Sequence, residues 1–74
     1  MFNPNREMAS VSNRILVKMV SEILDYHNTG ILSDGEVRNF AARCKELDIH
    51  NSLTIAENTI TREVLKRFNN FIIE

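Results

Sequence analysis

The clearest pattern in the chain is a stripe of apolar residues between Ser12 and His27. Apolar side chains recur there at steps of three and four residues, the period of one face of an α-helix. The stripe comprises Ile15, Leu16, Met19, Val20, Ile23 and Leu24. The polar residues between them are expected on the opposite, exposed face: Arg14, Lys18, Glu22 and Asp25. Gly30 can adopt the left-handed conformation that closes a helix, so we expect the helix to end at residues 28–30.

A second helix is predicted to begin at the sequence Ser33-Asp34-Gly35-Glu36. Ser33 and Glu36 can form a capping box, in which the side chain of each residue accepts a hydrogen bond from the backbone amide of the other. The apolar positions that follow again have the helical period: Val37, Phe40, Ala41, Cys44 and Leu47. Residues 48–52 are predicted to form a turn.

A third helix is predicted from a second capping-box sequence, Thr54-Ile55-Ala56-Glu57, to about Asn70. Its apolar stripe comprises Ile60, Val64, Leu65, Phe68, Phe71 and Ile72. The β-branched run Thr59-Ile60-Thr61 is poorly suited to a helix interior, so a break near Asn58 is expected.

Together these stripes predict an all-α fold, a small three-helix domain over residues 11–74 made of a helical hairpin and a third, C-terminal helix. The core is expected to contain all residues of the three stripes except Leu65 and Ile72. Residues 1–10 show no apolar period and contain the only proline, Pro4, so they are expected to form a flexible leader that contributes little to the core.

Charge and composition narrow the classes of function. Nine Lys and Arg residues against ten Asp and Glu residues give a net charge of −1, without a field that favours nucleic acid or an anionic membrane. No apolar stretch is long enough for a membrane span or a signal peptide. Cys44 has no second cysteine to pair with and lies on an apolar stripe, so we expect a core residue in a cytoplasmic protein.

One local sequence suggests a metal site. The twelve residues 25–36 carry an acidic or polar residue or glycine at four characteristic positions, with Asp25 first, Gly30 sixth, Ser33 ninth and Glu36 twelfth. This spacing resembles the loop of the EF-hand family and implies calcium binding through Asp25, Ser33 and Glu36. The third and fifth positions depart from the family, because His27 and Thr29 replace its oxygen donors. A helix stop followed by a helix cap explains the same residues without metal, and this is the interpretation we prefer.

A second alternative is nucleic-acid binding. Residues 37–69 can be arranged as a helix, a turn and a recognition helix that carries Arg62, Lys66 and Arg67. However, the turn has no glycine at the expected place, Glu63 would oppose the phosphates, and no other basic patch supports the contact. Three surface cations on an amphipathic helix are the simpler explanation.

The preferred function is a small non-enzymatic protein-interaction module, such as an adaptor, a subunit regulator or a phage-type inhibitor of a host protein. One cysteine, two isolated histidines and no phosphate loop leave no catalytic constellation, and no cofactor is expected. A three-helix domain cannot bury all the apolar residues near its C-terminus. The predicted interface comprises Leu65, Phe68, Ile72 and Ile73. It would contact another protein or a second copy of the chain.

Overall fold

The computed structural model describes the backbone of residues 1–73 and the side chains of residues 1–72. This part of the chain is all-α, as predicted, and contains no strand. Its helices are α1 (Pro4–Ala9), α2 (Asn13–Thr29), α3 (Glu36–Cys44) and α4 (Ser52–Ile73). The three predicted helices correspond to α2, α3 and α4, and α1 was not predicted.

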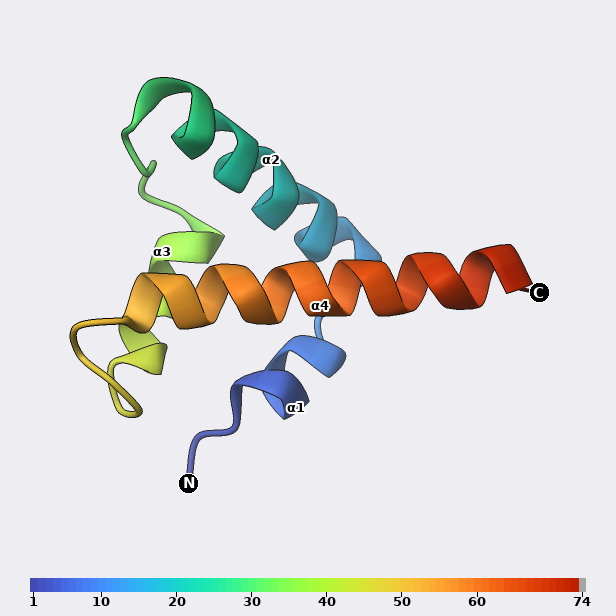
Figure 1. Cartoon of the computed structure of the whole chain (residues 1–74), viewed down its shortest axis with the longest axis horizontal. Helices are drawn as coiled ribbons and strands as arrows, with labels where there is room; N and C mark the ends of the chain where they lie inside the picture. The colour runs from blue at the N-terminus through green and yellow to red at the C-terminus, as the bar shows by residue number, and fades with distance from the viewer. Residues whose placement is uncertain (74) are drawn as a thin grey trace.

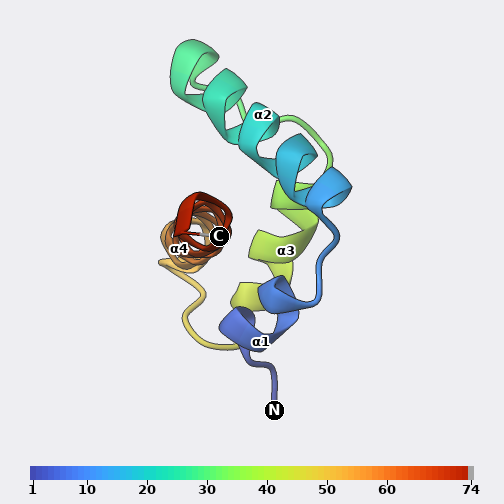
Figure 2. The ribbon, with the colours of Figure 1, turned by 90° about the vertical axis from the view of Figure 1, so that its right-hand side faces the viewer.

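The helices form two layers (Figures 1 and 2). α4 runs along most of the longest axis of the molecule, and α1, α2 and α3 pack across one side of it. The molecule measures 38 × 32 × 16 Å. The shortest dimension leaves room for only two layers, because packed helix axes lie about 8–10 Å apart. The last turns of α4 extend beyond the other helices (Figure 1).

α2 begins and ends as its sequence predicts. The Ser12 hydroxyl accepts a hydrogen bond from the Ile15 amide, and Gly30 closes the helix with φ of 76°. The expectation that Glu22 lies on the exposed face is wrong: this residue is 8% exposed. It lies three residues after the buried Met19, on the face of α2 that packs against α3.

The expectation that residues 1–10 contribute little to the core is also wrong. Asn3 caps α1 through a 3.1 Å hydrogen bond from the Arg6 amide, and Pro4 occupies the first turn. Met8 is fully buried. An asparagine cap followed by proline is a recognised helix start, so a sequence signal for α1 exists.

Side chains at the N-terminus hold α1 against α3. The Phe2 ring packs edge-on against Phe40, with centroids 6.0 Å apart. The Arg43 guanidinium lies 5.0 Å from the centre of the Phe2 ring and pairs with the Glu7 carboxylate. α3 therefore supplies both apolar and charged contacts to the N-terminal segment.

α3 is capped by a residue from another helix, and the predicted Ser33–Glu36 capping box does not form. The Glu22 carboxylate accepts hydrogen bonds from the amides of Glu36, at 3.4 Å, and Val37, at 2.9 Å. Gly35 makes room for this carboxylate, because a Cβ atom there would lie 2.6 Å from Glu22 Oε2. The cap is thus a long-range contact that joins α2 to α3.

α4 starts earlier and continues further than predicted. It begins at Ser52, so the predicted Thr54–Glu57 capping box lies inside the helix, and it runs without a break past Asn58 to Ile73. The Thr59 hydroxyl donates to the carbonyl oxygen of Ile55 at 2.7 Å. This bond satisfies a polar group that would otherwise be buried without a partner in the middle of the helix.

The core is smaller than the stripes predict. Nine apolar residues are buried: Met8, Leu16, Met19, Val37, Phe40, Ala41, Cys44, Ala56 and Ile60. Seven of these were predicted, whereas Met8 and Ala56 were not. Four expected core residues are instead 47–78% exposed: Leu24, Leu47, Phe68 and Phe71. Leu24, Phe68 and Phe71 continue their helical stripes but are left exposed, whereas Leu47 lies after the end of α3 at Cys44.

Cys44 provides a test of this core. The residue is fully buried, as predicted. Burial raises the pKa of its thiol, and the Arg43 charge lowers it by a smaller amount. Because the thiolate is the reactive form, reaction with a chromogenic disulfide reagent should be slowed roughly a hundredfold in the folded protein relative to the denatured protein. A cysteine introduced at the exposed Ala42 should react rapidly, and equally rapid reaction of Cys44 would contradict the packing of α3.

Candidate protein-interaction site

Most of the large apolar side chains that are exposed in residues 1–72 gather along the junction of α2 and α4 and the end of α4. Two adjoining hollows of about 490 and 270 Å³ lie between these helices and share Val20 and Val64 in their walls. The larger hollow is further lined by Leu16, Val17, Phe68 and Phe71. The smaller is further lined by Ile23, Leu24, Ile60 and Leu65. We call the two together the α2–α4 groove.

The groove continues onto the projecting end of α4. Leu65, Phe68, Phe71 and Ile72 are 59–78% exposed and follow one another at three- and four-residue steps or as direct neighbours. We call these four residues the apolar end of α4. Three of the four predicted interface residues therefore lie together on the surface. The fourth, Ile73, has a side chain outside the described part of the structure.

The titratable groups at the groove are already paired. Arg67 lines one hollow and forms an ion pair with Glu63 at 2.7 Å. His27 lines the other, and its Nε2 atom lies 3.4 Å from Glu57 Oε2. The remaining polar lining consists of Asn13, Ser21 and Thr61. The groove therefore presents a largely apolar surface. The His27 imidazole and the Arg67 guanidinium, which border it, each contact a glutamate of the same chain.

Arg67 joins α4 to the end of α1 and the start of α2. Its guanidinium donates to Asn13 Oδ1 at 2.7 Å and to the Val11 carbonyl oxygen at 2.6 Å. It also donates to the carbonyl oxygens of Met8, at 3.2 Å, and Ala9, at 3.4 Å. These carbonyls belong to the end of α1 and the connection to α2, so Arg67 fixes α4 beside both helices. No local sequence pattern indicates this role, because the partners are 54 to 59 residues away.

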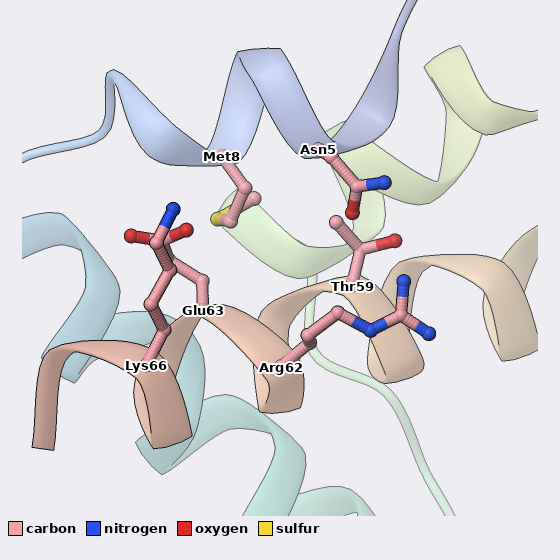
Figure 3. A pocket seen from close by; sticks show the side chains of 6 residues that line it. All are labelled: Asn5, Met8, Thr59, Arg62, Glu63 and Lys66. Carbon is pink, nitrogen blue, oxygen red and sulfur yellow. The ribbon is translucent and has the colours of Figure 1, made fainter. Parts of the chain in front are cut away.

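The cations predicted for nucleic-acid binding are separated by this arrangement. Arg62 and Lys66 line a small hollow of about 120 Å³ between α1 and α4, together with Asn5, Met8, Thr59 and Glu63 (Figure 3). In that view, Asn5 and Met8 reach down from α1 toward the side chains of α4. Arg67 is instead committed to the α1–α2 connection. The predicted trio does not form one basic surface.

The connection between α3 and α4 also differs from a helix-turn-helix. It spans residues 45–51, longer than the three or four residues typical of that motif. Asp48 organises it by accepting from the Asn51 side chain at 2.8 Å and the His50 amide at 3.0 Å. Both bonds lower the pKa of the Asp48 carboxyl group, and the bond from the Asn51 side chain has the larger effect.

The predicted calcium loop does not have the EF-hand conformation. α2 continues to Thr29, so the first five loop positions, from Asp25 onward, are helical. The Thr29 hydroxyl donates to the carbonyl oxygen of Asp25 at 2.9 Å, as in an ordinary helix end. Within residues 1–73, no three or more His, Cys, Asp or Glu side chains are close enough together to hold a metal ion. The alternative calcium set of Asp25, Ser33 and Glu36 therefore lacks the EF-hand loop conformation on which it was based.

None of the helices in residues 1–73 is both long enough and apolar enough to span a bilayer. The α2–α4 groove, with its hollows of about 490 and 270 Å³, is the candidate interaction surface in residues 1–72. Comparisons with family models, curated proteins and solved structures found none that matches this chain.

Proposed function

We propose that this chain is a non-enzymatic protein-interaction module that binds its partner through the α2–α4 groove and the apolar end of α4. The observation that carries the proposal is the exposure of six large apolar side chains on one junction of two helices. They are Val17, Leu24, Leu65, Phe68, Phe71 and Ile72. Exposed apolar patches larger than those of ordinary monomers are typical of protein interfaces.

The chemistry of the groove supports binding over catalysis. A nucleophile needs a base within hydrogen-bond reach, and the groove's one imidazole, that of His27, is directed at Glu57. An anionic ligand needs a free cation, and the groove's guanidinium, that of Arg67, is engaged by Glu63 and by backbone carbonyls. An apolar helix face or side chain is the ligand that such a groove accommodates best.

Site-specific photocrosslinking in the native host would test the proposal. A photoreactive phenylalanine analogue replaces Phe71, which is 78% exposed and lines the groove. The matched control places the same analogue at Ile49, which is 65% exposed in the α3–α4 connection. We expect a discrete protein adduct from position 71 and none from position 49. Adducts of equal yield from both positions, or from neither, would contradict the proposed surface.

A further inference from the structure

Building on the proposed function, we propose that the occupant of the α2–α4 groove is a second copy of this chain, in a two-fold symmetric dimer. The two α4 helices would run antiparallel near Phe68. Phe71 and Ile72 of each chain would enter the other chain's groove near Val64 and Leu65. Three observations favour a second copy: the exposed area, the shape of the surface and its charge.

The exposed area matches one half of a dimer interface. The six exposed apolar side chains of the groove and α4 end are 58–78% accessible. At roughly 100 Å² each, they present about 600 Å² of apolar surface. This is the upper limit for the largest patch of an ordinary monomer, about 300–600 Å². A standard dimer buries about 800 Å² per subunit. The remaining exposed surface of the half-buried Val20, Ile23 and Val64 adds to the apolar area of about 600 Å² and brings the total close to that of a standard dimer.

The shape is self-complementary because a groove and a ridge lie side by side on the same chain. The groove lies where α2 diverges from α4, and the ridge is the end of α4 that projects past the other helices (Figure 1). A two-fold axis between them places each ridge in the opposite groove. Such an isologous contact closes after two copies and does not continue into a filament.

The charge of the surface also favours an identical partner. The whole chain has a net charge of −1, and Arg67 and His27, at the groove, are each paired within their own chain. There is therefore little charge with which to select an oppositely charged partner, and little repulsion between two copies. The symmetric contact is driven by apolar burial.

Light scattering of the purified full chain, measured across a wide concentration range, would test this inference. We expect a mass approaching twice 8.6 kDa at high concentration. The double variant Leu65→Glu with Ile72→Glu should raise the dimer dissociation constant roughly a hundredfold or more, with helical circular dichroism retained. The control variants Ile31→Glu and Ile49→Glu, at exposed sites away from the groove, should leave the mass unchanged.

Two other outcomes would overturn the inference, and a third passes the test to another variant. A folded double variant that still dimerises would place the contact elsewhere. If the double variant unfolds, the single change Phe71→Glu, at a 78% exposed site, decides the question by the same measurement. A wild-type chain that stays monomeric excludes the dimer. In that case, a crosslinked adduct of a different protein at position 71 would preserve the proposed function, and the absence of any adduct would remove both.

Discussion

Replacing Arg67 with methionine is expected to lower the free energy of unfolding by about 2–4 kcal/mol, because charged hydrogen bonds are lost from a partly buried site. The substitution keeps most of the apolar stem but removes the guanidinium. It would leave the Glu63 carboxylate, on a side chain only 11% exposed, without its partner. It would also leave the Val11 carbonyl oxygen without its 2.6 Å donor. Urea denaturation followed by circular dichroism measures the change.

Lys66→Met is the matched control for this prediction. Lys66 precedes Arg67 on the same helix but is exposed and makes no hydrogen bond or ion pair among the described residues. Its replacement should change stability by less than about 0.5 kcal/mol. Equal effects of the two substitutions would show that Arg67 acts only as a surface charge.

The second large effect is expected at the cap of α3. Glu22→Ala should destabilise the protein by about 2–3 kcal/mol, because the buried Val37 amide loses its 2.9 Å acceptor and the positive end of α3 loses a carboxylate. Gly35→Ala should act through the same contact. Its new Cβ would lie 2.6 Å from Glu22 Oε2, and the flexible carboxylate would avoid it only by leaving the two amides.

A double-mutant cycle separates this explanation from backbone strain. Gly35 has φ of −167°, an extended conformation open to any residue. In a Glu22→Ala background, Gly35→Ala should therefore be neutral or stabilising by about 0.4–1 kcal/mol. The gain would arise because alanine lowers the conformational entropy of the unfolded chain. Unfolding midpoints of the four proteins in urea give the coupling energy. Additive effects would mean that the two residues act independently.

The sequence predicts those features that depend on local periodicity and local caps. α2 has a regular apolar stripe, a serine cap and a glycine stop, and its predicted position agrees with the structure to within two residues at either end. Cys44 is buried because its stripe faces α4 and α2, as the helical period requires. Leu65 and Ile72 lie to the side of the predicted core stripe, and both are 61% exposed, as that position indicates.

The features that the sequence does not predict depend on contacts between distant segments. Ser33 and Glu36 have the spacing of a capping box, but Glu22 from α2 reaches the same amides and replaces it. Phe68 and Phe71 continue the stripe of α4 and line the hollow beside α2, yet the neighbouring helices leave them 59% and 78% exposed. Periodicity indicates which residues share a helix face. It does not indicate where the neighbouring helix ends.

The bonds from Arg67 to the α1–α2 connection have a consequence for the order of folding. Arg67 and Met8 are 59 residues apart, so α1 is secured by α4, which is synthesised after the other three described helices. Contacts of such sequence separation require a large loop to close before they contribute stability. α2 and α3 can associate early through Glu22, whereas the contacts between α1 and α4 form only after α4 has been made. A newly made chain is therefore expected to leave the α4-facing side of Met8 uncovered until α4 has been added.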